Sequence, residues 1–136
     1  MKDCIFCKIA EGKFSADKIY EDKNVFAFLD ISPVNFGHAL VIPKKHFENL
    51  NSIDEGYFCD VMKISKKISD ALIKSLKADG TNITINNGKA AGQLVPHLHV
   101  HIIPRFSDDK LKYDWPTKKY PDGEMKKIAD KLRKNL

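Results

Sequence analysis

Residues 97–103 read His-Leu-His-Val-His-Ile-Ile, so three of the five histidines in the chain alternate with apolar residues. Successive side chains of a β-strand point to opposite faces. A strand here would place the imidazoles of His97, His99 and His101 on one face and bury the intervening apolar side chains on the other. The pattern therefore predicts a strand that is packed on one side and carries imidazoles on its other side.

The histidine row has three physical interpretations. A plain solvated face is disfavoured, because Asn86-Asn87-Gly88 and the turn at Gly92-Gln93 lead straight into the row. Two histidines two residues apart can converge on a zinc ion. A neutral imidazole is also a nucleophile that can attack phosphorus when an acceptor holds its other nitrogen. In this last interpretation the middle histidine attacks and its neighbours position it.

The stretch from Gly92 to Arg105 resembles the signature of the histidine triad (HIT) family of nucleotide hydrolases and transferases. Two upstream segments, residues 28–33 and 37–46, resemble further blocks of this family in the expected order. The resemblance covers roughly the first four-fifths of the chain and is strongest to the Hint branch and its microbial relatives. It implies the HIT fold, whose five-stranded antiparallel sheets commonly pair across a homodimer.

The length and composition fit one globular domain that spans residues 1–136, with 43% hydrophobic and 30% charged residues. No apolar run approaches the roughly 20 residues of a membrane span, and the first residues do not resemble a signal peptide. We therefore expect a cytoplasmic protein without a membrane partner. The net charge of +5 is carried by dispersed lysines, which mostly mark a solvated surface, so we expect no nucleic-acid partner.

The residue pattern predicts an α+β fold in which an antiparallel sheet carries one long helix and short flanking helices. We expect helices over residues 4–11, from a capping box at 52–55 to Leu76, and from Met125 to Leu136 with Asp122 as a cap. We expect strands over residues 18–21, 25–29, 38–42, 82–86 and 97–103, the last closed by Pro104. The connection over residues 87–96 is long enough to suggest a functional loop.

Cys4 and Cys7 form a C-x-x-C pair, and Cys59 lies in a helical pattern as an expected small buried residue. A redox pair of the thioredoxin type would need a strand before it, and only three residues precede Cys4. Half of a zinc site is the favoured interpretation, with two unbridged thiols as the alternative. The family resemblance implies that His46 and His97 complete a structural zinc site.

The resemblance also implies the chemistry. His99 would attack the α-phosphorus of a nucleotide and form a nucleotidyl-histidine that water hydrolyses. His101 would donate to the phosphate or the bridging atom, His38 would support the row by hydrogen bonding, and His97 would tie the metal to the active strand. Gln93 and nearby main-chain N–H groups would hold the remaining phosphate oxygens.

The activity that this implies is a nucleoside phosphoramidase that releases AMP from purine nucleotide derivatives. Two alternatives remain: hydrolysis of dinucleoside polyphosphates, and a binding module that holds purine nucleotides without turnover.

The nucleotide would contact a larger set of residues. The family positions around the base are Phe6, Ile9, Phe28 and Ile31, although apolar residues of this kind can equally be plain core. Asp30 would accept the ribose hydroxyls, because a carboxylate accepts two vicinal hydroxyls well. The phosphate side would be formed by Asn86, Gly92, Gln93, Leu94, His99 and His101.

Two departures from Hint proteins concern the leaving group. Leu94 stands where many Hint proteins carry a hydroxyl residue, which leaves only a backbone donor at this position. The last 30 or so residues, including Trp115-Pro116, are also longer than the short tail of the eukaryotic Hint proteins.

Overall fold

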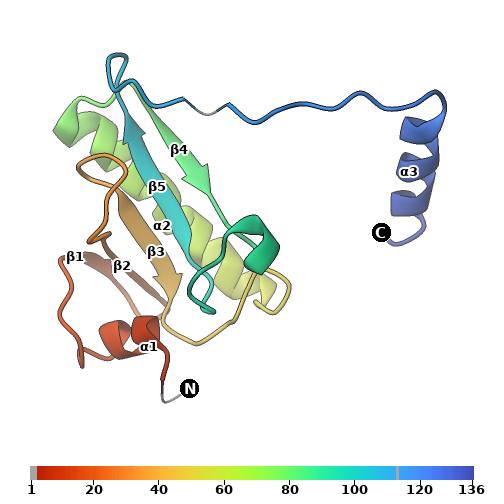
Figure 1. Ribbon diagram of the computed structural model, residues 1–136. Coiled ribbons are helices and arrows are strands. Elements are labelled where there is room, and N and C mark those ends of the chain that lie inside the picture. Colours follow the sequence, from red (N-terminus) through yellow and green to blue (C-terminus); the bar gives the residue numbers. More distant parts are fainter. Residues whose placement is uncertain (1–2, 113) are drawn as a thin grey trace.

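The computed structural model describes residues 3–112 and 114–136 (Figure 1). Its elements follow in the order α1 (Ile5–Ala10), β1 (Lys18–Glu21), β2 (Val25–Leu29), β3 (Ala39–Pro43), α2 (Glu55–Leu76), β4 (Gly80–Thr84), the short 3₁₀ helix η1 (Lys89–Ala91), β5 (Val100–Arg105) and α3 (Glu124–Arg133). No helix among the described residues is long and apolar enough to cross a membrane.

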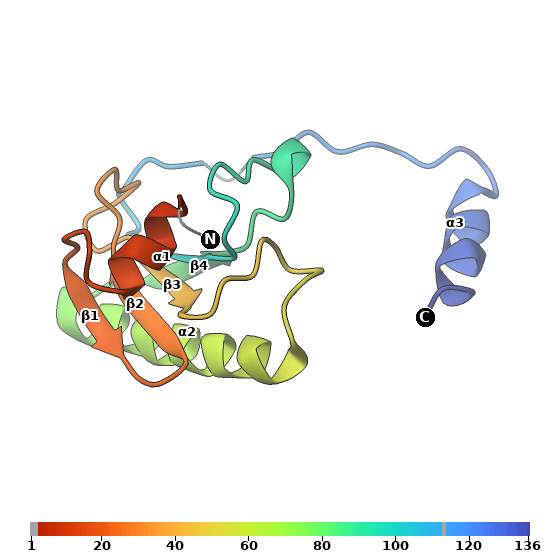
Figure 2. The same ribbon diagram turned by 90° about the horizontal axis from the view of Figure 1, so that it is seen from below.

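The five strands form one antiparallel sheet in the order β1-β2-β3-β5-β4. The long helix α2 lies along one face of the sheet, and the short helix α1 lies on the opposite side (Figure 2). This arrangement confirms the predicted α+β fold with a five-stranded antiparallel sheet and one long helix. The strand order leaves β1 and β4 at the two edges of the sheet.

Alternation along the strands builds a separate apolar layer on each face of the sheet. One layer joins α2 to the sheet, through Val61, Ile64, Ile68 and Leu72 of the helix and Val25, Ala27, Ala39, Val41, Val100 and Ile102 of the strands. The other layer joins α1 to the sheet, through Cys4, Phe6, Cys7, Phe26, Phe28, Leu40 and Ile42. Both faces of β2 and β3 are therefore buried, which explains their nearly unbroken apolar sequence.

The strand that carries the histidine row starts later and ends later than predicted. β5 begins at Val100, because the backbone N–H of Leu98 donates instead to the carbonyl of Phe47, at 2.7 Å. Pro104 does not close β5 but lies inside it. It is tolerated because the pairing of β5 with β3 ends at Ile102, so no partner strand needs an N–H at Pro104 on that side.

The neighbouring strand and the end of the long helix also differ from the prediction. β4 covers Gly80–Thr84 and not 82–86, because Gly80 already pairs with Arg105, the last residue of β5. Asp54 is the N-cap of α2, without a side-chain cap bond, so no capping box forms there. Cys59 is exposed and not buried, because it lies on the outer face of α2.

A glycine joins the loop before β3 to the last turns of α2. Gly37 has a φ of +99°, and a Cβ added to it would lie 2.5 Å from Cδ1 of Leu76 and 3.1 Å from Cδ2 of Leu72. A residue with a Cβ would be strained by the positive φ and would also clash with these leucine side chains. Only glycine therefore fits this position at little cost. The loop over residues 31–38 is therefore held directly against the helix end.

The final helix α3 forms where its apolar repeat predicted, but it begins at Glu124 with Gly123 as its N-cap and not Asp122. None of its residues is buried, and an extended segment separates it from the sheet (Figure 1). Its apolar side chains therefore do not belong to either layer of the core.

Candidate active site and metal cluster

His99 is held with one ring nitrogen free for chemistry. Its Nδ1–H donates to the carbonyl oxygen of His97 at 2.7 Å, which leaves the lone pair on Nε2. Burial lowers the pKa of His99 below its ordinary value, so the ring is neutral near pH 7. A neutral imidazole with a fixed tautomer is the form that acts as a nucleophile.

A relay of hydrogen bonds sets the tautomer of His101. The backbone N–H of Val34 donates to Nδ1 of His38 at 3.1 Å, so the proton of His38 is on Nε2. This Nε2 lies 2.9 Å from Nδ1 of His101, which must accept, so the proton of His101 is on its own Nε2. That buried Nε2 has no hydrogen-bond partner among the described residues. It is therefore a donor without an acceptor.

The two imidazoles lie side by side and are both uncharged. The ring centroids of His99 and His101 are 4.9 Å apart. Burial, with smaller contributions from His99 and His38, lowers the pKa of His101 to about 4. A potential nucleophile and an oriented N–H donor thus stand next to each other on the face of the sheet that α1 covers.

A cavity of about 610 Å³ opens against these two rings. Ten of the eleven residues expected to contact a nucleotide line it: Phe6, Ile9, Phe28, Asp30, Ile31, Asn86, Gly92, Leu94, His99 and His101. Much of the cavity lining is apolar, and Phe6 meets Phe28 edge to face with ring centroids 5.6 Å apart. The half-buried Asp30 adds a carboxylate to the lining.

Some of these residues lie in surroundings that the sequence did not indicate. Ile31 and Leu94 are 96% and 92% exposed, so they belong to the rim of the cavity and not to its floor. Gln93 is not among the cavity-lining residues. Its amide braces the loop instead, accepting from the N–H of Gly88 at 2.8 Å and donating to the carbonyl of Glu48 at 2.6 Å.

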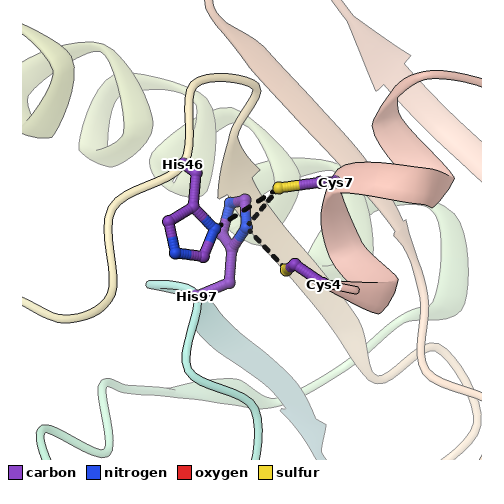
Figure 3. A group of neighbouring side chains, drawn as sticks. All are labelled: Cys4, Cys7, His46 and His97. Atoms are coloured by element: carbon purple, nitrogen blue, oxygen red, sulfur yellow. Dashed lines mark hydrogen bonds between the residues drawn. The ribbon is translucent and has the colours of Figure 1, made fainter. Parts of the chain in front are cut away.

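A second cluster lies beside the cavity and joins three distant segments (Figure 3). Cys4 and Cys7 come from the start of α1, His46 from the loop after β3, and His97 from the residues before β5. Nδ1 of His97 is 3.3 Å from Sγ of Cys4 and 3.5 Å from Sγ of Cys7, and Nδ1 of His46 is 3.3 Å from Sγ of Cys7. Each residue offers one ligand atom, and these atoms all lie within 4.8 Å of one another.

The geometry of the cluster fits a metal ion. Nε2–H of His97 donates to the carbonyl of Pro43 at 2.8 Å, which directs the Nδ1 lone pair toward the thiols. Tetrahedral zinc with sulfur and nitrogen ligands needs ligand separations of about 3.3–3.8 Å. The three sulfur-to-nitrogen distances, 3.3, 3.3 and 3.5 Å, lie in this range. Burial raises the pKa of Cys7 to about 11, so the metal-free thiol is protonated. The four residues could therefore hold a metal, as the sequence suggested.

His97 belongs to this cluster and does not line the cavity, but its backbone connects the two sites. Its ring faces the cysteines, while its carbonyl oxygen accepts the Nδ1–H of His99. The sequence did not reveal the backbone partners of these rings, namely Val34, Pro43 and the carbonyl of His97, because backbone groups carry no sequence signal. Cavity-lining residues that were also missed are Ile5, Phe14, Ser15, Ala16, Ser32, Leu40 and Val95.

The chain belongs to the histidine triad (HIT) family, because the HIT domain model matches residues 11–108. A HIT-like protein of Methanocaldococcus jannaschii is 51% identical over 78% of this chain and 81% of its own length. The adenosine 5′-monophosphoramidase of Saccharomyces cerevisiae is 39% identical over 98% of this chain and 82% of its own length. The family and these relatives support a nucleotide hydrolase in general terms.

Solved structures of similar proteins show the same fold. A HIT family protein from Bacillus subtilis superposes with a TM-score of 0.91, at 39% identity, and covers 98% of this chain and 97% of its own. A protein from Streptococcus mutans superposes with a TM-score of 0.93, at 41% identity, over 99% of this chain and 86% of its own. A zinc-bound family member from Mycobacterium smegmatis has a TM-score of 0.79, at 37% identity, over 99% of both chains.

Proposed function

We propose that the protein is a nucleoside phosphoramidase that releases AMP from purine nucleotide derivatives through a nucleotidyl-histidine intermediate. The observation that carries this proposal is the pair formed by His99, with a lone pair on Nε2, and His101, with an unpartnered Nε2–H, against one cavity. The monophosphoramidase relatives support the reaction type.

In the first step, Nε2 of His99 attacks the α-phosphorus, the bond from phosphorus to the leaving nitrogen breaks, and this nitrogen takes up one proton and departs as the free amine. Negative charge spreads over the phosphoryl oxygens, and the oriented Nε2–H of His101 donates to one of them or to the bridging atom. In the second step, water attacks phosphorus, the bond from phosphorus to Nε2 of His99 breaks, and the water releases one proton, which offsets the proton taken up by the amine. Two displacements at phosphorus replace one difficult displacement, which is the general advantage of covalent catalysis.

The nucleoside would occupy the apolar part of the cavity. The base would contact Phe6 and Phe28, and the ribose hydroxyls would donate to Asp30, whose Oδ1 is already fixed by the N–H of Ser32 at 2.8 Å. Asn86 and the backbone near Gly92 would meet the phosphate side. The predicted role of the Gln93 side chain becomes indirect, because its amide supports the loop that would present this backbone.

We propose zinc as the metal of the Cys4, Cys7, His46 and His97 cluster. When bound, zinc would contribute folding free energy and hold the residues before β5 in place. Four protein ligands leave no open coordination position for substrate, so turnover should not require an added divalent ion. The zinc-bound relative supports this assignment.

We also propose a cytoplasmic homodimer. Reduced Cys4 and Cys7 suit a reducing compartment. The open edge strand β4 offers unpaired backbone groups, which supports pairing with a second sheet.

The decisive experiment compares wild-type protein with His99→Ala. Each is incubated with an adenosine phosphoramidate, a dinucleoside polyphosphate and ADP in parallel, and samples are quenched with acid for mass spectrometry. We expect AMP release from the phosphoramidate and an adenylyl adduct on the peptide that contains His99. His99→Ala should lose at least a thousandfold in kcat and the adduct, while it still binds AMP.

Each competing function gives a distinct result. Faster turnover of the dinucleoside polyphosphate would favour that alternative, and AMP binding without turnover of any substrate would favour a binding module. Near-normal kcat in His99→Ala would exclude this residue as the nucleophile.

A further inference from the structure

The loop between β2 and β3 presents His38 to His101, but the apolar side chains of this loop bury little surface. Val34 and Phe36 are 50% and 88% exposed, so they contribute little packing that would hold the loop in place. Figure 1 shows the loop, in orange, beside the arrowhead of β5. The position of the loop therefore depends on particular contacts with the rest of the molecule, and the close approach of Gly37 to α2 is one of them.

The half-buried Asn35 supplies a second contact, at the end of β5. Its Nδ2 donates to the carbonyl oxygen of Pro104 at 2.9 Å and to Oδ2 of Asp109 at 3.1 Å. The ladder between β3 and β5 ends at Ile102, so β3 supplies no N–H for the carbonyl of Pro104. The amide of Asn35 takes the place of this strand partner.

The carboxylate of Asp109 is itself well fixed. Its side chain is 7% exposed and accepts from Nε and Nη2 of Arg105, at 2.7 and 3.0 Å. It also accepts from the backbone N–H groups of Phe106 and Leu111, at 3.0 and 2.9 Å. Nη1 of Arg105 donates in turn to Oδ1 of Asn82 in β4, at 2.7 Å. The loop is therefore fastened to a group that β4 and β5 hold in place.

The backbone of Asn35 also reaches His38. Its carbonyl oxygen accepts the N–H of His38 at 3.0 Å, which closes a turn over residues 35–38. The residue before it, Val34, donates its own N–H to Nδ1 of His38. Asn35 thus connects the turn that holds His38 with the strand that carries His101.

We infer that Asn35 is a positioning residue for the reaction: by fastening the loop to β5, it aligns Nε2–H of His38 with Nδ1 of His101 and keeps the proton of His101 on Nε2. The two ring nitrogens lie 2.9 Å apart, and a hydrogen bond weakens steeply as it bends. Asn35 is not among the cavity-lining residues, so it acts through His38. The inference rests on the proposed function, because it assigns a role in that reaction.

The test replaces Asn35 by Asp, which keeps the shape of the side chain. This change removes both donated hydrogen bonds and places a second carboxylate beside Asp109. Asn82→Asp is the matched control, because it adds the same charge to the same group of residues but contacts Arg105 rather than the loop. Asn35→Ala removes the amide without adding a charge, and it carries the test if Asn35→Asp does not fold.

Steady-state hydrolysis of an adenosine phosphoramidate separates positioning from binding. We expect kcat of Asn35→Asp to fall about 5- to 20-fold, with KM and the Kd of AMP within about threefold of wild type, because no cavity-lining residue is changed. Asn82→Asp should keep all three values. The proposal is overturned if kcat of Asn35→Asp changes by about twofold or less, if AMP binding is lost together with kcat, or if Asn82→Asp loses as much kcat.

A second measurement needs no substrate. In ¹⁵N-labelled protein, a scalar coupling across the N–H···N hydrogen bond joins Nε2 of His38 to Nδ1 of His101. It should be present in wild type and Asn82→Asp, and be reduced by about half or more in Asn35→Asp, because the bond is then misaligned. An unchanged coupling in Asn35→Asp, or none in wild type, would refute the positioning role. If wild type hydrolyses no phosphoramidate, the proposed function fails, and the coupling still decides whether Asn35 aligns the two rings.

Discussion

Replacing His38 by Phe tests whether the relay from Val34 to His101 controls the reaction. His38 is 4% exposed, and its ring makes both hydrogen bonds of the relay. His38→Phe fills the space with a ring that can neither accept nor donate. The N–H of Val34 and Nδ1 of His101 then lose their partners, which should cost about 1–3 kcal/mol of stability for each buried group left unpaired.

The effect on catalysis follows from the proton of His101. Without His38, neutral His101 can carry its proton on Nδ1, and the ring is free to turn. Removal of an oriented donor costs about 2.7–4 kcal/mol in other active sites, and loss of orientation alone should cost less. We therefore expect kcat to fall about 10- to 100-fold, which corresponds to about 1.4–2.8 kcal/mol, with little change in KM.

The assay is steady-state hydrolysis of an adenosine phosphoramidate, combined with ¹⁵N NMR of the histidine rings. In the wild type, Nε2 of His101 should show the shift of a protonated nitrogen and Nδ1 that of an acceptor. Val34→Ala is the matched control, because it keeps the backbone N–H and should keep kcat. If folded His38→Phe retains kcat within twofold, or if wild-type His101 is protonated on Nδ1, the relay does not position the donor.

Three further predictions concern pH, metal and nucleoside. The pKa of His101 is about 4 in the folded protein and ordinarily about 6.5, so the unfolded chain takes up this proton first as the pH falls. The neutral, buried ring therefore contributes up to about 3 kcal/mol to the free energy of unfolding. This contribution is fully present above pH 6.5 and is lost as the pH falls toward 4. Urea unfolding of wild type and His101→Asn at pH 7 and pH 5 should show a smaller loss in the variant. Cys7→Ala should release zinc, measured by elemental analysis, and lower Tm by several degrees, whereas exposed Cys59→Ala should do neither; zinc-free wild-type protein purified without chelator would contradict the assignment. Asp30→Asn should raise KM for nucleotide about tenfold with a smaller effect on kcat, and an unchanged KM would argue against a contact with the ribose.

The strands and helices were predictable where the residue pattern has one dominant period. β1 and β2 have the predicted bounds, and α2 extends to Leu76 as expected. The start of β5 was harder to predict, because the alternation of histidines and apolar residues begins upstream of the strand, at His97. Residues 97–99 keep an alternating arrangement without a ladder, held by contacts such as Leu98 N–H to the Phe47 carbonyl.

The grouping of side chains was more predictable than their surroundings. The C-x-x-C spacing and the family resemblance predicted a cluster of Cys4 and Cys7 with the distant His46 and His97. The structure places all four residues in one cluster. Solvent exposure was not predictable at Ile31 and Leu94, since an apolar residue at a cavity rim has the same sequence signal as one in the core. The histidine tautomers were also not predictable, because hydrogen bonds to backbone groups determine them.

Gly37 makes the far end of α2 relevant to chemistry that takes place on the opposite face of the sheet. The loop that supplies the Val34 N–H to His38 is seated on Leu72 and Leu76 through this glycine. A larger residue at position 37 would shift the loop and the backbone N–H of Val34. This N–H sets the tautomers of His38 and His101. In a mutational scan scored for activity, these helix positions should therefore appear as distal sites, although none of them lines the cavity.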